Sequence, residues 1–189
     1  DAGRFSAKDE IGIAIDKAKR SVDAKALEPG KYTVVLEPAA SGHLISDMMT
    51  GFDARQCDEG RSFLTKKGGG NRLGEKVFDE RVTVYADPAH PESAVLPWDE
   101  DGLARGRLSI INKGVVDSLR YSRYWAKLKG KEAVAVPGNI IMEGGDKSTM
   151  DLVKSTQKGI LVTRTWYIRL VDPQTVLLTG LTRDGTFYI

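Results

Sequence analysis

The sequence predicts an α+β fold in which a mostly antiparallel, strongly twisted sheet carries a few flanking helices. Apolar residues recur at helical spacing in the first third of the chain, and β-branched runs bounded by Gly, Pro and Asp dominate after Gly60. Hydrophobic residues make up 41% and charged residues 29% of the 189 positions, as in ordinary globular proteins. No repeat or low-complexity linker divides the sequence, so we predict a single domain over residues 1–189.

The first helix is expected to follow Ser6, which forms a partial capping box with Asp9. A buried strand is predicted at residues 32–36, and Pro38 should open a second helix over about residues 39–51. The apolar face of the first helix would consist of Ile11, Ile15, Ala18 and Val22. The apolar set of the second would be Leu44, Ile45, Met48, Met49 and Phe52.

The middle of the chain alternates short strands with turns. Asn112-Lys113-Gly114 is predicted to be a three-residue hairpin loop, with Gly114 in the left-handed conformation. A short helix is expected from about residue 118 to residue 129, with Gly130 as its C-cap. The expected strands in this region are residues 82–85, 108–111, 115–116 and 140–142.

The last quarter of the chain should contain one helix and three strands. Ser148 and Asp151 form a second capping box, starting a helix that we expect to end at Gly159. Asp172-Pro173 and Asp184-Gly185 are turn dipeptides, so they should separate the strands. Those strands are predicted at residues 160–170, 175–181 and 186–189.

Charge and composition exclude several classes of protein. Lys and Arg number 28 against 26 Asp and Glu, and a net charge of +2 argues against nucleic-acid binding. No apolar run approaches the roughly 20 residues that a membrane helix needs. Cys57 is the only cysteine, which favours a reducing, cytoplasmic compartment. The chain lacks an initiating Met and stops within a predicted strand, so we expect a fragment of a longer protein.

The catalytic residue types are sparse. His43 and His90 are the only histidines, and neither has a histidine partner within two helical turns, so a helical zinc-protease motif is absent. A zinc site from both histidines, Cys57 and a carboxylate is conceivable in three dimensions, but we favour a packed or surface role for His43. Counting leaves a Ser-His-Asp triad open, although no Gly-x-Ser-x-Gly elbow is present. The two acids that follow Cys57 should raise its pKa and disfavour a nucleophile.

The most distinctive segment is Gly68–Glu75, Gly-Gly-Gly-Asn-Arg-Leu-Gly-Glu. Successive glycines cost backbone entropy and are typical of places where side chains would collide. Bare backbone amides can bind phosphate, but no Lys-Ser or Lys-Thr follows these glycines, so we favour a close-packed or partner-contacting loop. The loop also coincides with cations that have no evident partner in the sequence. The candidate substrate- or partner-binding residues are therefore Arg61, Gly69, Asn71 and Arg72.

From Leu27 to Ile189 the sequence resembles the carboxyl-terminal region of the TldD/PmbA family, whose PmbA members are also called TldE. The resemblance rests on the order and spacing of motifs at residues 27–36, 58–63, 70–75, 121–124, 142–145, 159–164 and 184–187. The family that the chain resembles consists of predicted zinc-dependent proteases and their inactivated homologues. Its older name is modulator of DNA gyrase. TldD-type members carry His-Glu-x-x-x-His on the helix after the strand that corresponds to residues 32–36. PmbA-type members lack it and pair with a TldD-type partner in a peptidase that degrades unfolded peptides and trims precursor peptides.

This chain departs from the active pattern, because Ser46, Asp47 and Gly51 occupy the positions of the His, Glu and His. The resemblance therefore implies a non-catalytic PmbA/TldE-type subunit with no metal of its own, zinc residing in an active TldD-type partner. The expected partners are that subunit or a second copy of this chain, together with a peptide substrate, and a family amino-terminal domain would be missing. The alternatives are an active metallopeptidase or other hydrolase with unrecognised ligands, and a nucleic-acid-associated module, which the charge disfavours.

Overall fold

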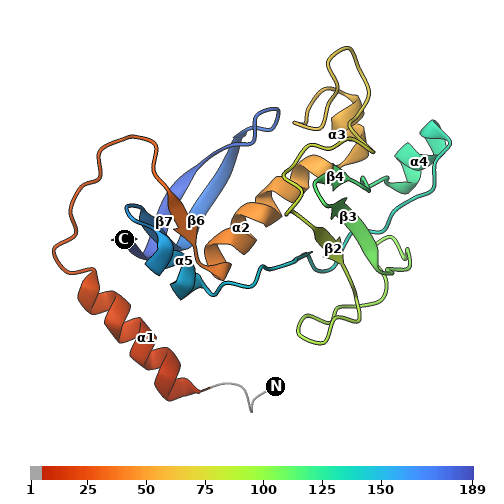
Figure 1. Ribbon diagram of the computed structural model, residues 1–189. Helices are drawn as coiled ribbons and strands as arrows, with labels where there is room; N and C mark the ends of the chain where they lie inside the picture. Colours follow the sequence, from red (N-terminus) through yellow and green to blue (C-terminus); the bar gives the residue numbers. More distant parts are fainter. Residues whose placement is uncertain (1–5) are drawn as a thin grey trace. The chain divides into compact units, whose positions relative to one another are not determined.

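The computed structural model describes residues 6–189 (Figure 1). The chain groups into two compact units, which are described separately. The first unit contains the chain up to residue 45, residues 146–169 and residues 178–189. The second unit contains residues 46–145 and 170–177.

The first unit opens with α1 (Ala7–Arg20). As predicted, Ser6 caps this helix by accepting a hydrogen bond from the backbone N–H of Asp9. Its apolar face, however, buries no residue, and Ile11 is 58% exposed. The helix is held instead by polar contacts: Lys17 forms a 2.8 Å ion pair with Glu37.

The sheet of the first unit has the order β1-β6-β7 (Figure 1). β1 (Val34–Leu36) runs parallel to β6 (Ile160–Asp172), which forms a hairpin with β7 (Leu177–Tyr188). The predicted break at Asp184-Gly185 was wrong, since both residues lie within β7 with positive φ angles of 62° and 126°. Arg164 and the Thr163 hydroxyl on β6 bond across the hairpin to this segment, so the strand continues through it.

Two further helices, α5 and α2, begin in the first unit. The capping box of Ser148 and Asp151 is confirmed at the start of α5 (Thr149–Ser155). This helix ends before Gly159, whose N–H donates instead to the carbonyl of Ile189. α2 (Pro38–Met49) begins at the predicted proline, and its final turn belongs to the second unit. It continues there into the 3₁₀ turn η2 (Thr50–Phe52).

The second unit contains an antiparallel sheet in the order β4-β3-β2-β5. Asn112 pairs with Val115, so the hairpin loop has two residues rather than the predicted three. Lys113 and Gly114 both have positive φ, 46° and 82°, as a type I′ turn requires. The strands are β2 (Val84–Ala86), β3 (Leu108–Asn112), β4 (Val115–Val116) and β5 (Ile141–Met142). The α+β class and the predominance of antiparallel pairing are confirmed.

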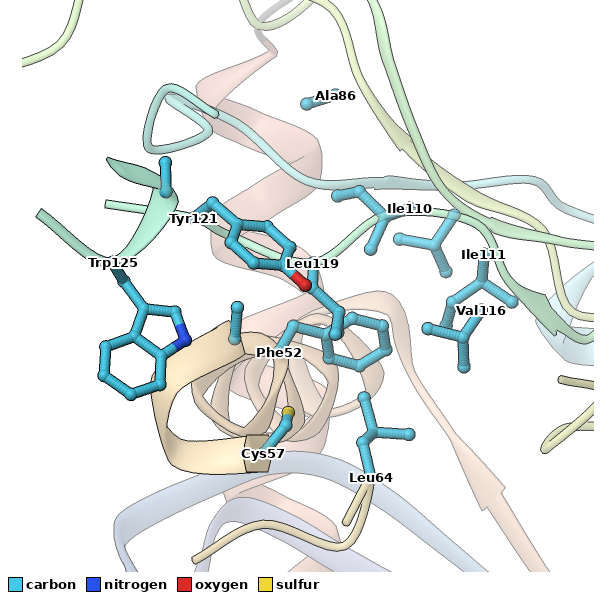
Figure 2. Packing of buried hydrophobic residues seen from close by; sticks show 13 residues of the cluster. Phe52, Cys57, Leu64, Ala86, Ile110, Ile111, Val116, Leu119, Tyr121 and Trp125 are labelled. Atoms are coloured by element: carbon cyan, nitrogen blue, oxygen red, sulfur yellow. The ribbon is translucent and has the colours of Figure 1, made fainter. Parts of the chain in front are cut away.

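Two short helices flank this sheet. α3 (Ala54–Asp58) was not predicted, and it is capped by Asp53, which accepts from the N–H of Gln56. α4 (Arg123–Lys129) starts later than predicted because Ser122 caps it, whereas Gly130 is the predicted left-handed C-cap. Between the sheet and these helices lies a core of 13 buried residues (Figure 2). None of the helices described is long and apolar enough to cross a membrane.

Candidate functional site

The three residues that we predict at the zinc-motif positions lie at the end of α2 and in η2. Ser46 and Asp47 belong to the last turn of α2, and Gly51 is buried in η2. A Cβ atom added at Gly51 would lie 2.6 Å from Cε1 of Phe63 and 3.3 Å from the Ser62 hydroxyl. A side chain at this position would therefore require Phe63 to move.

The donor set at this place does not fit a zinc ion. Protein zinc sites use histidine, cysteine and carboxylate ligands, three or four to each ion. Here a hydroxyl, one carboxylate and a glycine hydrogen stand in those positions. Among residues 6–189, no three His, Cys, Asp or Glu side chains gather in a way that could hold a metal. Within the first unit, Nδ1 of His43 bonds to the Thr165 hydroxyl at 2.8 Å.

Beside η2, within the second unit, lies an open groove of about 360 Å³. We call it the α2–β3 groove. Its floor and walls are apolar and consist of Met49, Phe52, Leu108, Ile110, Leu119, Val134, Val136, Pro137 and Ile140. Its polar lining consists of Ser46, Thr50, Asp53, Gln56, Ser118 and Arg120. Apolar walls with a few polar groups are typical of a ligand site.

One ion pair lies in the lining of the α2–β3 groove. Arg120 Nη1 and Asp53 Oδ2 are 3.7 Å apart, too far for a hydrogen bond. The backbone of the same region is fixed, because the Arg120 N–H donates to Phe52 and its carbonyl accepts from Ala54. The guanidinium of Arg120 therefore extends from a fixed backbone beside an apolar lining.

Cys57 is a free cysteine in the core of the second unit, with 0% of its surface exposed. Its thiol donates to the Gly51 carbonyl, 3.2 Å away. Burial raises the pKa of Cys57 to about 11, with Asp53 and Asp58 adding smaller effects. The predicted direction is thus confirmed, but desolvation rather than the neighbouring acids is the main cause.

The glycines of the Gly68–Glu75 loop are required by backbone conformation. Gly68, Gly69 and Gly70 have φ angles of 98°, 111° and 82°, which side chains strongly disfavour. A Cβ at any of the three would meet no described atom within 4 Å. The expectation of a crowded loop was therefore wrong for contacts within the chain.

Arg61 and Arg72, the two cations among the predicted binding residues, are paired, contrary to expectation. Arg61 bonds to Glu59, and Arg72 lies 3.3 Å from Glu75. The pKa of Glu59 is lowered by hydrogen bonds from Arg55 and Arg61. The pKa of Glu75 is lowered chiefly by its hydrogen bond with Lys66, whose Nζ is 2.7 Å away.

Asn71 has a structural contact in the second unit. Its amide donates to Asp58 Oδ1 at 2.7 Å, and the indole of Trp125 donates to the other oxygen at 2.9 Å. None of the predicted binding residues, Arg61, Gly69, Asn71 and Arg72, lines the α2–β3 groove. Sequence reasoning missed Arg120 and the apolar residues around it, because the groove joins segments more than 50 residues apart.

Comparison with known proteins decides the family. Residues 29–189 match the family described as the PmbA/TldA metallopeptidase C-terminal domain. The chain belongs to this family. The TldD/PmbA resemblance noted from the motifs is therefore confirmed.

Relatives and solved structures agree with this assignment. A metalloprotease of Archaeoglobus fulgidus is 32% identical over 133 residues, covering 70% of this chain and 29% of the relative. A metalloprotease of Methanothermobacter thermautotrophicus is 26% identical over 160 residues, covering 77% of this chain and 34% of that relative. The chain thus spans about a third of the length of these relatives.

Two solved structures have the same fold. A putative modulator of DNA gyrase from Bacteroides thetaiotaomicron superimposes with a TM-score of 0.73 at 28% identity, over 88% of this chain and 40% of that one. TldE from Thermococcus kodakarensis superimposes with a TM-score of 0.74, over 98% of this chain and 47% of that one. Its identity is 19%, so this second likeness concerns the fold alone.

Proposed function

We propose that this chain is part of a non-catalytic PmbA/TldE-type subunit in a TldD/PmbA peptidase system that degrades or trims unfolded peptides. The observation that carries the proposal is the residue types at the predicted motif positions, because Ser46 and Gly51 stand where a zinc peptidase would have histidines. The chain would act together with a zinc-bearing TldD-type subunit, or as a dimer with a second copy of itself, in the cytoplasm.

The chemistry of the second unit supports a binding role. A zinc peptidase needs a metal with an open coordination position and a base that activates water. Ser46 and Gly51 offer no zinc ligand of the usual kind, and Cys57 keeps its proton at neutral pH. The α2–β3 groove, by contrast, offers apolar surface and a positioned cation to a peptide.

Metal analysis of purified full-length protein tests the proposal. Three samples are compared: the protein alone, a His-Glu-x-x-x-His relative from the same genome alone, and a mixture of the two. We expect stoichiometric zinc only in samples that contain the relative, with peptide hydrolysis tracking the zinc. Stoichiometric zinc and hydrolysis by the protein alone would favour the alternative, an active hydrolase with unrecognised ligands.

The Gly68–Glu75 loop is the proposed partner contact. Its first three glycines are exposed, and no described atom lies near their missing side chains. A Gly69→Trp substitution should weaken dimerisation or peptide turnover. Gly102→Trp is the matched control, because Gly102 also has positive φ and open surroundings. Equal dimer affinity and turnover in both variants, measured by ultracentrifugation and peptide assay, would refute this contact.

A further inference from the structure

We propose that the α2–β3 groove binds the carboxyl-terminal end of a peptide, with the last, apolar side chain on its floor and the terminal carboxylate on Arg120. The inference rests on the proposed function in one respect, that the ligand is a peptide. It adds a chemical preference to that function: a free carboxylate joined to a large apolar residue.

The dimensions and floor of the groove fit a short apolar ligand. Its volume of about 360 Å³ lies at the lower end of the roughly 300–1,000 Å³ of ligand sites. Phe52, Ile110 and Leu119 are buried side chains of the second unit's core (Figure 2), and all three also line the groove. Such a groove accepts one or two residues at the end of a chain more readily than a long extended segment.

Arg120 has hydrogen-bonding capacity that the protein leaves unused. Its side chain is 42% exposed and lines the groove. Within residues 6–189 its guanidinium donates no hydrogen bond, and its nearest carboxylate, Asp53, is 3.7 Å away. Asp53 uses its Oδ1 to cap α3 by accepting from Gln56. A carboxylate can therefore bind the planar fork of Arg120 in bidentate fashion.

The position of the cation favours a main-chain carboxylate. Arg120 follows Leu119 in the chain, and its N–H bonds to the carbonyl of Phe52. The backbone of Arg120 is thus fixed next to two residues of the apolar lining. A terminal carboxylate and the side chain of the same residue are separated by one carbon atom, which matches this arrangement. An acidic side chain would bring the charge without the apolar group.

Fluorescence anisotropy on the full-length protein tests the inference. The probe is a labelled hexapeptide ending in Phe, compared with its carboxyl-terminal amide and with a version ending in Asp. We expect the amide and the Asp-ended peptide to bind at least about tenfold more weakly, as for loss of a charge-assisted pair or of the apolar contact. Equal binding of the free acid and the amide would overturn the proposal.

Variants separate the groove from the rest of the surface. Arg120→Gln should abolish the difference between acid and amide, while Arg123→Gln, outside the groove, should retain it. Ser46→Trp, at an exposed position in the lining, should block binding even if Arg120→Gln folds poorly. Loss of the difference in Arg123→Gln, or unchanged binding in Ser46→Trp, contradicts the assignment.

Two further measurements distinguish the possible failures. Octanoate carries a carboxylate and an apolar chain but no peptide bond. If octanoate displaced the probe with the same affinity as the Phe-ended peptide, the ligand of the groove would be a small amphipathic acid rather than a peptide. Zinc held by this protein alone would refute the proposed function but leave the carboxylate preference intact. A missing carboxylate preference would refute this inference and leave the zinc result unaffected.

Discussion

The two units of the chain bury their apolar residues to very different extents. The second unit gathers 13 buried residues into one cluster. Within the described residues, the first unit has two clusters of only three buried residues each. Large side chains there are exposed instead, among them Ile11 on α1, Trp166 on β6 and Leu181 on β7. The second unit therefore carries its own hydrophobic stabilisation, whereas the first depends more on backbone pairing and polar contacts.

Truncating a core side chain should have the largest effect. Leu64 is 0% exposed in the second unit, so Leu64→Ala should lower the free energy of unfolding by about 2–5 kcal/mol. Ile11→Ala on α1 is the control, and it should change that free energy by less than about 0.5 kcal/mol. Urea denaturation measures both. Similar losses in the two variants would contradict the proposed difference between the units.

A crowded glycine should be less replaceable than an open one. In Gly114→Ala the new Cβ would lie 2.3 Å from the Phe78 carbonyl oxygen, and the residue would also have to keep a φ of 82°. In Gly69→Ala the conformation alone is unfavourable, because nothing lies within 4 Å. We expect the free energy of unfolding to fall by about 3 kcal/mol in Gly114→Ala and by about 1 kcal/mol in Gly69→Ala. Equal thermal midpoints would show that crowding at the β3–β4 turn is relieved by backbone movement.

Cys57 should make the second unit sensitive to alkali. Its pKa is raised from 9.0 to about 11, so the folded state retains a proton that the unfolded chain releases. The associated stability is present below pH 9 and is lost as pH rises toward 11, by up to about 3 kcal/mol. Cys57→Ala should flatten this part of the pH profile, measured by urea denaturation from pH 7 to 11. The native thiol should also react with a thiol reagent only after denaturant is added.

Asp99 should have a smaller effect at the acid end. Its pKa is lowered, first by the hydrogen bond from the Val136 N–H and then by those from Leu103 and Asp101. The stabilisation is therefore present above the ordinary pKa of an aspartate and is lost as pH falls through the lowered value. Asp99→Asn should reduce the acid dependence of the thermal midpoint between pH 2 and 5. An exposed aspartate, Asp146, supplies the control substitution, which should leave that dependence unchanged.

The parts of the fold that the sequence predicted are those governed by local chemistry. Ser6, Ser148 and Gly130 act within one helical turn of the ends they define, so their types alone indicate the caps. β7 passes through Asp184-Gly185 because of bonds from β6, 20 or more residues earlier. Local turn propensity could not reveal those partners.

The candidate site was less predictable because it depends on distant residues. The absence of zinc ligands at Ser46 and Gly51 follows from residue types, but the crowding of Gly51 by Phe63 comes from a separate loop. α3 was missed because a five-residue helix has little periodicity, and its start is tied to the backbone of Arg120. The α2–β3 groove likewise arises only when three separated segments meet.

The carboxylate of Asp58 has a consequence for cooperativity in the second unit. Its side chain is only 10% exposed, and it joins the glycine loop through Asn71 to α4 through Trp125 and Lys129. Opening either segment would remove part of the donor set of this largely buried anion, which is unfavourable away from water. The loop and the helix should therefore exchange their amide hydrogens in a single concerted event, and a segment rich in glycine would behave as part of a rigid body.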